Sequence, residues 1–260
     1  MYVVTGAANA IGFIPMYLAG GFGPLTPKLG MGIDNIVSAR LLLSTGETID
    51  ASSTENADVF EAICGGGQAL GIVSELTVAT YPLAETVGSL DGSVWSGTIA
   101  FPAERAADVT GMLEKLTVTP EMATYMTVAL PPPELGMPLT APMIVFMLGY
   151  FGSDAQAEEA FADINALGPA LRMAQRVPYA EMNNRNDGFQ EPGGFKRPFG
   201  IGLDKISAPA LTELTQHVAE FVTRGPDFHR TCVVFQMLGV EKLRESSVGI
   251  YPHRSLKYWW

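Results

Sequence analysis

The sequence predicts an α+β fold in which helices cover a mainly antiparallel sheet, and two observations support this prediction. Strand-like apolar or β-branched runs alternate with amphipathic helical patterns along most of the chain. The 260 residues are 47% hydrophobic and 17% charged, which is typical of a packed globular protein with one large or two smaller domains.

The first unit of the predicted fold, residues 1–83, alternates short strands and helices. Residues 36–43 form a largely apolar run, so we expect a buried strand there. Ser53 or Thr54 is placed to cap the helix that follows, because either side chain can accept a hydrogen bond from the first turn. The elements expected in this unit are a strand at 2–5, a helix at 11–18, a loop at 24–30, strands at 36–43 and 48–50, a helix at 55–63 and a strand at 71–80.

The second unit, residues 84–260, continues the alternation with longer elements. Ser153 is placed to cap a helix whose apolar residues recur at helical spacing. The last three residues, 258–260, are large aromatics that would normally pack against more protein, so we expect a truncated chain with an exposed apolar patch. The expected elements are strands at 93–101, 122–130, 141–151 and 231–238, helices at 103–116, 154–167 and 208–223, and an irregular loop at 183–197.

The most unusual stretch is Cys64–Val73, which contains three consecutive glycines between an expected helix and an expected strand. Glycines cost backbone entropy in either element, so the stretch is either a flexible loop or a place where the backbone approaches a flat or anionic group. A Rossmann dinucleotide motif is excluded, because that motif follows a strand and opens a helix, whereas this stretch follows a helix and opens a strand.

The charge balance bears on the class of partner. Sixteen Lys and Arg residues against 27 Asp and Glu residues give a net charge of −11, which argues against nucleic acid and anionic membranes. No run is long and apolar enough for a transmembrane span, and Met1 does not open a signal-peptide pattern. The sequence therefore assigns no compartment.

Cysteine and histidine are scarce. Cys64 and Cys232 allow one disulfide, although two free buried thiols are favoured. His217, His229 and His253 are scattered and lack the spacing of metal ligands, so no metal site is expected. His253 is interpreted as a structural, hydrogen-bonded histidine rather than as a base.

Several glycine-rich motifs occur in a fixed order, and together they resemble one protein family. Each motif is weak alone, but their occurrence together in one order makes the resemblance specific. The family is that of the FAD-linked oxidases of the vanillyl-alcohol oxidase superfamily, with a PCMH-type FAD-binding domain, and within it the berberine-bridge-enzyme-like group of fungal secondary metabolism. The matching segments are Gly6–Gly12, Leu18–Leu25, Gly30–Ser38, Thr45–Glu47, Glu55–Ile63, Cys64–Val73 and, near the end, Tyr251–Arg254.

The resemblance implies FAD as the cofactor and a two-domain organisation. Residues 1–83 are similar to the second part of the FAD-binding domain, and residues 84–260 fall where the family keeps its substrate-binding domain, here expected to be incomplete at the C-terminus. Glycine backbone amides would hold the pyrophosphate, and Ile72 and Val73 would offer backbone groups to the adenine end. The cofactor-binding residues that it implies are Gly6, Gly12, Gly20, Gly21, Gly23, Asp34, Asn35, Gly65, Gly66, Gly67, Gly71, Ile72 and Val73.

Two readings of the pair Asp34 and Asn35 are compatible. The resemblance implies that the pair orders the loop beside the flavin. The local sequence also fits an Asx turn or a cap at the entry to the strand that follows.

The chain departs from the family pattern at several positions. Ala8 stands where bicovalent members carry the flavin-linking cysteine, so that bond cannot form and FAD is expected to be non-cysteinyl. The histidine-bearing segment of the family would precede Met1 and is not in this sequence, and the C-terminal element that completes the flavin site is also absent. Gln68–Leu70 replaces the usual "GNF", and Cys64 stands where an arginine is frequent.

The activity that the resemblance implies is oxidation of a small organic, secondary-metabolite-like substrate, with hydride transfer to flavin N5 and O2 as electron acceptor. No catalytic base is assigned. Candidates by position are Tyr125, Tyr150, Tyr179 and Glu181, and a core or surface role suits each of them as well. The alternative function is that of a truncated or degenerate homologue that no longer binds FAD and serves a structural or interaction role.

Overall fold

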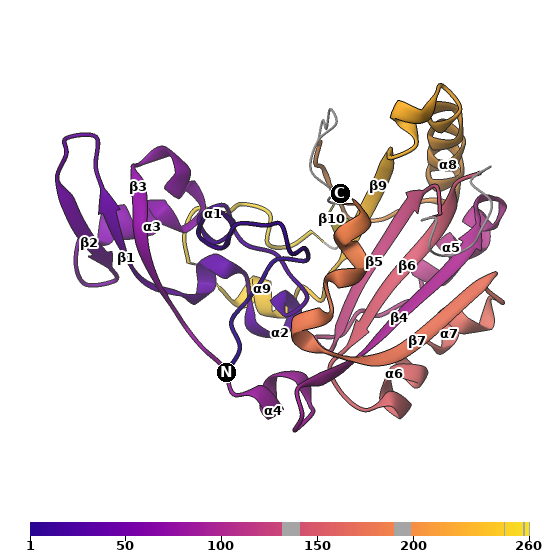
Figure 1. Cartoon of the computed structure of the whole chain (residues 1–260), viewed down its shortest axis with the longest axis horizontal. Helices are drawn as coiled ribbons and strands as arrows, with labels where there is room; N and C mark the ends of the chain where they lie inside the picture. The colour runs from indigo at the N-terminus through magenta and orange to yellow at the C-terminus, as the bar shows by residue number, and fades with distance from the viewer. Residues whose placement is uncertain (132–140, 190–198, 247, 257, 260) are drawn as a thin grey trace.

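The architecture confirms the α+β prediction, since helices and two antiparallel sheets are built from successive parts of the chain (Figure 1). The smaller sheet comes from the N-terminal residues, in indigo and purple, and the larger sheet comes from the later residues. The domain boundary at residue 83 remains a prediction. The structure is a computed structural model, and it describes residues 1–131, 141–189, 199–246, 248–256 and 258–259.

The smaller sheet has three antiparallel strands in the order β2-β1-β3. The central strand β1 (Ile36–Leu42) pairs with β2 (Thr48–Ser52) across a tight turn and with β3 (Ile72–Val78) on its other edge. Helices α1 (Phe13–Leu18) and α3 (Ala57–Gly66) contact each other, and α3 also contacts β1 and β2. The apolar run predicted at 36–43 therefore forms the middle of a sheet that packs on these helices.

Two expectations for the first segment are wrong in part. Residues 2–5 do not form a strand, because only Tyr2 makes a β-bridge, to Tyr81. The expected loop at 24–30 contains a single helical turn, α2 (Thr26–Leu29), with a proline near its start where the fixed φ of proline suits a helix.

The start of α3 also differs from the prediction. Its N-cap is Asn56, in the left-handed region at a φ of 46°, and no side chain caps the helix. Ser53 and Thr54 lie in the turn before it, where the Ser52 hydroxyl oxygen accepts from the backbone N–H of Thr54 at 3.3 Å. This local hydrogen bond stabilises the turn, so the helix begins later than its sequence suggests.

The larger sheet has seven strands in the order β7-β4-β6-β5-β9-β10-β8, and every pairing described between them is antiparallel. Its strands are β4 (Ser93–Pro102), β5 (Met122–Ala129), β6 (Met143–Tyr150), β7 (Leu171–Pro178), β8 (Gly202–Leu203), β9 (Cys232–Met237) and β10 (Tyr258–Trp259).

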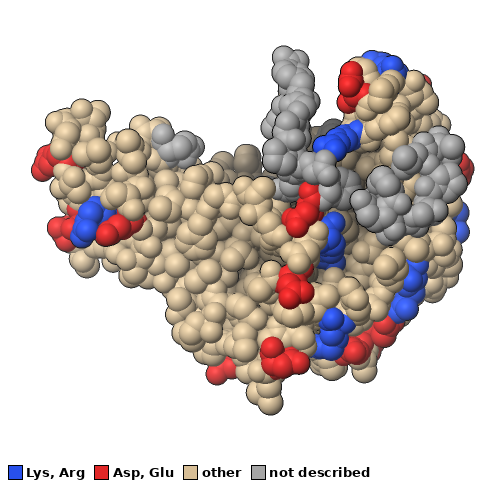
Figure 2. Space-filling model, in the orientation of Figure 1, with Lys and Arg blue, Asp and Glu red and all other residues tan. Residues whose placement is uncertain are grey.

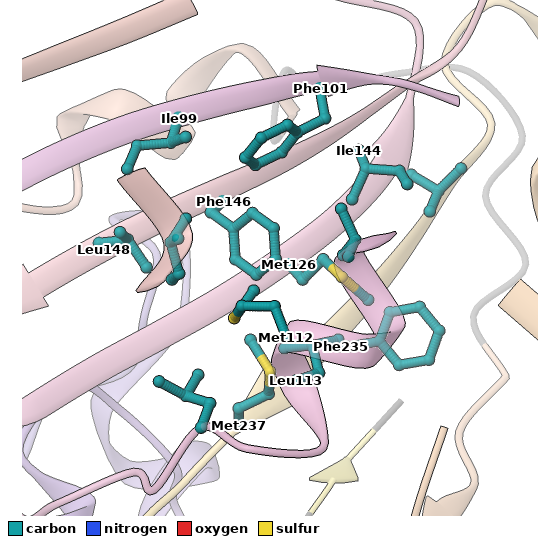
Figure 3. Close-up of a cluster of buried hydrophobic side chains, with 14 of the residues drawn as sticks. Ile99, Phe101, Met112, Leu113, Met126, Ile144, Phe146, Leu148, Phe235 and Met237 are labelled. Carbon is teal, nitrogen blue, oxygen red and sulfur yellow. The ribbon is translucent and has the colours of Figure 1, made fainter. Parts of the chain in front are cut away.

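Helices cover one face of the larger sheet and enclose the main core (Figure 1). Figure 3 shows this core, in which Phe101 and Phe146 from the sheet lie near Met112 and Leu113 from α5. The opposite face of the sheet is turned toward the N-terminal residues. The remaining helices are α4 (Leu83–Val87), α5 (Ala106–Leu113), α6 (Asp154–Ala160), α7 (Ala162–Ala166), α8 (Ala208–Val222) and α9 (Glu241–Glu245).

The second unit differs from the prediction at several places, and the short elements α4, β8, α9 and β10 were not expected. The edge strand β7 is not predicted, because most of its residues are exposed and it carries two arginines that pair with acids of neighbouring segments. Ser153 caps α6 as predicted, but the helix breaks at Phe161 and continues as α7. The expected loop at 183–197 begins as a 3-10 helix at Asn184–Phe189, and its residues 190–197 lie outside the described part.

The segment after β9 returns to the N-terminal part of the molecule. Leu243 of α9 is fully buried in the core of the smaller sheet, and α9 contacts α2. We call residues 246–254 the return segment; Figure 1 shows this part of the chain in yellow beside the purple helices. The side chains of residues 258–260 lie outside the described part, so the apolar patch expected there stays a prediction.

Candidate functional site

The turn that follows α1 carries three of the predicted cofactor glycines, and atoms of the chain itself occupy the space beside them. Gly20 and Gly21 have φ values of +117° and +82°, a conformation that glycine adopts most readily. A Cβ atom on Gly21 would lie 2.8 Å from Gly32 Cα, and one on Gly23 would lie 1.6 Å from the carbonyl oxygen of Thr5. These glycines therefore let two backbone segments cross closely.

The glycine run at the end of α3 packs against the return segment. Cys64 and Gly65 leave the helical conformation and kink the chain there. A Cβ atom on Gly65 or Gly66 would meet the Ile250 side chain at 3.3 or 3.0 Å, and the space beside Gly67 is filled by a leucine of α1. The carbonyl oxygen of Cys64 accepts from the backbone N–H of Ile250 at 3.0 Å. The run is thus an internal contact surface.

The last members of the glycine stretch lie at the start of β3. A Cβ atom on Gly71 would lie 2.5 Å from the carbonyl oxygen of Leu42, so this glycine permits the approach of β1. Val73 is buried, whereas the Ile72 side chain is 68% exposed. Among the described strands, β3 pairs on only one side, which leaves the backbone groups of its outer edge open to a ligand.

The turn between Gly6 and α1 is the most open of the predicted cofactor segments. Gly6 is buried against Ile11, but Gly12 is exposed, and Ile11 and Phe13 are exposed by 45% and 40%. Ala8 is buried and carries only a methyl group, so a thioether to flavin cannot form at this position. This turn offers a small-residue surface with apolar flanks.

Asp34 and Asn35 are held by many partners. The Asp34 carboxylate accepts from the backbone N–H of Met31 at 2.8 Å and from the Ser246 hydroxyl at 2.6 Å, and it pairs with Arg254 at 2.8 Å. Asn35 is buried and donates from Nδ2 to the carbonyl oxygen of Met31 at 2.7 Å. The pair thus caps the loop at the entry to β1, as the local sequence predicts. Its role beside a flavin stays a proposal.

The sheet face opposite the helices carries a buried polar cluster. Tyr125 and Thr127 of β5 are buried there, and in the described part of the chain their hydroxyl groups have no hydrogen-bond partner. Tyr179 is also buried, and its hydroxyl lies 3.1 Å from the Thr5 hydroxyl. Burial raises the pKa of Tyr179 to about 12 and raises the pKa of Tyr125 further, so both are neutral at pH 7.

Residues 183–187 join this face to the N-terminal turn through amide side chains. Asn183 donates from Nδ2 to the carbonyl oxygen of Gly6 at 2.9 Å, and Asn186 donates to that of Ala7 at 2.6 Å. Asn9 in turn donates to acceptors within 183–187. The Gly6–Asn9 turn is therefore held beside the buried tyrosines, since Ala7 packs against the apolar cluster that contains Tyr125 and Tyr179. Residues 183–187 belong to the orange helical segment of Figure 1.

Arg185 points into the same cluster. Its Nη1 atom donates to the carbonyl oxygens of Leu148 and Gly97 at 2.7 and 3.4 Å and to the Ser96 hydroxyl at 3.0 Å. Its Nε atom and the Oδ1 atom of Asn186 are buried and have no hydrogen-bond partner within the described residues. Buried polar atoms are nearly always paired, so these two atoms have unused hydrogen-bonding capacity.

The structure separates the four candidates for a catalytic base into two groups by their position. Tyr125 and Tyr179 lie in the polar cluster, whereas Tyr150 packs with Phe161 on the helix-covered side and Glu181 is exposed. Sequence reasoning missed the contribution of Arg185 and its neighbouring asparagines. The signal was present in the run 183–187, where five consecutive polar side chains precede a glycine.

Charges are mixed on the face of the molecule shown in Figure 2, where Lys and Arg side chains alternate with Asp and Glu. In the described part of the chain, no group of three His, Cys, Asp or Glu side chains is arranged to hold a metal ion. The helices of that part are all too short or too polar to cross a bilayer.

Comparison with known proteins identifies homologues of the chain. No family model matches the chain. The chain is 26% identical to the FAD-linked oxidoreductase hasG of Aspergillus fumigatus, over 100% of this chain and 56% of that protein. It is 34% identical to (R)-6-hydroxynicotine oxidase of Paenarthrobacter nicotinovorans, over 64% of this chain and 34% of the relative. The VAO-type flavoprotein MtVAO713 of Myceliophthora thermophila C1 has the same fold at a TM-score of 0.72 and 21% identity, covering 99% and 48% of the two chains.

The chain is a homologue of FAD-linked oxidoreductases with the VAO-type flavoprotein fold. The family resemblance deduced from the ordered motifs is therefore confirmed, and berberine-bridge-enzyme-like proteins are among the similar structures. The chain spans about half the length of the curated relatives it matches. FAD is the cofactor of this family.

The residues present fit FAD at two places. Gly12 is exposed and has no side chain, so a flat ring could approach this turn beside Pro15, and the outer edge of β3 at Ile72 has backbone groups to offer. The buried Tyr125 hydroxyl and Asn186 Oδ1 atom, which have no hydrogen-bond partner in the described part of the chain, suit a polar ligand as well. The glycines at 20–23 and 65–67 instead pack against the chain itself, so they position the neighbouring segments.

Proposed function

We propose that this chain forms part of an FAD-dependent oxidoreductase that oxidises a small organic molecule, with O2 as electron acceptor. The observation that carries the proposal is the polar cluster of Tyr125, Arg185 and Asn186 between the open sheet face and the N-terminal turn. A ligand site contains a small number of polar groups that orient the ligand by hydrogen bonding. The unpaired buried groups of this cluster could orient a polar substrate beside the cofactor in this way.

The residues of this chain divide between holding the cofactor and holding the substrate. Gly12 and the backbone at Gly71–Val73 would contact FAD, without a cysteinyl bond because Ala8 has no sulfur. When bound, FAD supplies the hydride acceptor at its N5 atom. Tyr125 would orient the substrate by hydrogen bonding, since its raised pKa keeps its proton in place at pH 7.

The substrate class is a further part of the proposal. One relative is named for hydroxynicotine, a small heterocyclic molecule, and others are FAD-linked oxidoreductases of filamentous fungi such as Aspergillus. A small, secondary-metabolite-like substrate is consistent with these names. The face between residues 5–9 and 183–187 is closely bridged, which favours a compact molecule over a polymer.

A second candidate function rests on a different observation. Ile250 and Tyr251 of the return segment lie against Gly65, Gly66 and Gly20, and so fill glycine surfaces that the sequence assigns to the cofactor. A homologue that no longer binds FAD and serves a structural or interaction role would retain this internal packing. FAD affinity separates the two candidates.

The proposed function is tested by titrating FAD into the purified protein and following quenching of flavin fluorescence. Gly12→Leu places a bulky side chain on the open turn and is expected to weaken FAD binding by about tenfold. Gly111→Leu adds the same side chain in α5, where a Cβ meets nothing within 4 Å, and should leave binding unchanged. Absence of quenching with the unaltered protein, or equal affinity of both variants, contradicts the proposal.

A further inference from the structure

Arg185 is anchored on one side and unpaired on the other. The hydrogen bonds described for it all leave from Nη1 and end on β4 and β6, while the buried Nε has no partner in the described part of the chain. Among the described residues no carboxylate forms an ion pair with it, and the nearby acid, Asp187, accepts from Asn9 instead. The residue as a whole keeps partial exposure, so a solute can reach it.

An unpaired guanidinium in this position is unfavourable. Burial lowers the pKa of Arg185 to about 10, which still leaves the group charged at pH 7. A buried charge without a counter-charge destabilises the fold, and an anion that binds it relieves that cost. The planar edge formed by Nε and the free Nη2 side of a guanidinium matches the two oxygens of a carboxylate.

Tyr125 adds a second donor to the same position. Its hydroxyl is buried and unpartnered. Arg185 donates to the carbonyl oxygen of Leu148, whose partner across the β5–β6 pairing is Thr124, the residue next to Tyr125. Asn186 contributes an unpaired Oδ1 atom, which can accept from a hydroxyl or amine beside the bound acid group. Tyr125 on the sheet and Arg185 and Asn186 on the segment that crosses it thus each leave one buried polar atom unpaired among the described residues.

We propose that Arg185 and Tyr125 bind the carboxylate of a small organic acid, so that the substrate of the proposed oxidation carries a carboxylate group. That this acid is a substrate rests on the proposed function. Binding of the acid rests only on the geometry of Arg185, Tyr125 and Asn186.

The test compares an acid with its neutral isostere. Isothermal titration calorimetry measures binding of benzoate and of benzamide to the purified protein, without flavin. Benzoate is expected to bind about tenfold more tightly or better, because a charge-assisted pair with Arg185 is lost in the amide. Arg185→Gln should remove this preference and Tyr125→Phe should reduce it severalfold. Arg172→Gln, which removes an exposed arginine of β7 paired with Glu158, should leave it unchanged.

Several outcomes overturn the inference. It fails if benzoate does not bind, if benzoate and benzamide bind equally, or if Arg185→Gln binds benzoate as the unaltered protein does. If Arg185→Gln shows no cooperative thermal unfolding, Arg185→Lys decides, because it keeps the charge and loses the planar edge; it should lose most of the preference for benzoate. Benzoate binding without FAD binding refutes the proposed function alone, and FAD binding without benzoate binding refutes the carboxylate site alone.

Discussion

The ion pair between Asp34 and Arg254 is expected to carry much of the stability of the contact between the return segment and the N-terminal part. The pair joins positions 220 residues apart, and the two side chains are only 9% and 12% exposed. Replacing Arg254 by Met leaves the aspartate carboxylate buried without its counter-charge. Removing one partner of such a pair costs about 3–5 kcal/mol of unfolding free energy.

The structure places the cost at the lower end of that range. After the change, the Asp34 carboxylate still accepts from the backbone N–H of Met31 and from the Ser246 hydroxyl, so part of its solvation remains. We therefore expect a loss of about 3 kcal/mol, which corresponds to a fall in Tm of roughly 6–12 °C for a chain of this size.

Urea unfolding followed by circular dichroism measures this loss. The control is Arg40→Met, because Arg40 pairs with Asp50 on the surface, where the side chains are 45% and 55% exposed and such a pair contributes about 0.2–1 kcal/mol. A double-mutant cycle with Asp34→Asn isolates the coupling of the buried pair. If Arg254→Met costs no more than Arg40→Met, the return segment is not held by this pair and the reasoning is refuted.

Two further predictions concern glycine packing and thiol reactivity. Gly23→Ala should destabilise the protein by at least ~3 kcal/mol or prevent folding, because the added Cβ would lie 1.6 Å from the carbonyl oxygen of Thr5. Gly111→Ala in α5 should instead stabilise the protein by about 0.5–1 kcal/mol. Equal melting temperatures of the two variants would contradict this prediction. Burial, with a smaller effect of the Asp34 carboxylate, raises the pKa of Cys64 to about 11. At pH 8 the Cys64 thiol should therefore react with Ellman's reagent only after denaturation, whereas the exposed Cys232 should react in the native state. Two rapidly reacting thiols in the native protein would refute the burial of Cys64.

Much of the fold was predictable because its central elements carry strong periodic patterns. The strand at 36–43, the strand at 122–130 and the helix at 208–223 were all predicted within a residue or two of their observed ends. The edge strand β7 escaped prediction because edge strands face water on several sides, so their sequences lose the apolar alternation. The expectation of two buried thiols was right for Cys64 and wrong for Cys232, although both are free as expected.

The candidate site was predictable only in part, because long-range contacts set its composition. The order of glycine motifs identified the family, yet it did not show that Gly65 and Gly66 would be covered by Ile250 from the far end of the chain. Local sequence could not show that Arg185 would reach the β6 backbone near Tyr125 either, since this contact depends on how residues 183–187 cross the sheet. The assignment of the thirteen cofactor residues stays a prediction. The structure packs most of them against the chain itself, whereas Gly12 and Ile72 are exposed.

The visible absorption spectrum of the purified protein, reconstituted with FAD and passed through gel filtration, tests the central claim most directly. The account predicts a yellow protein with flavin bands, from which acid releases all of the flavin because Ala8 provides no sulfur for a covalent link. A colourless protein after reconstitution would contradict the assignment of this chain to the flavin-binding part of an FAD-linked oxidoreductase, and flavin that remains bound after acid treatment would contradict the role given to Ala8.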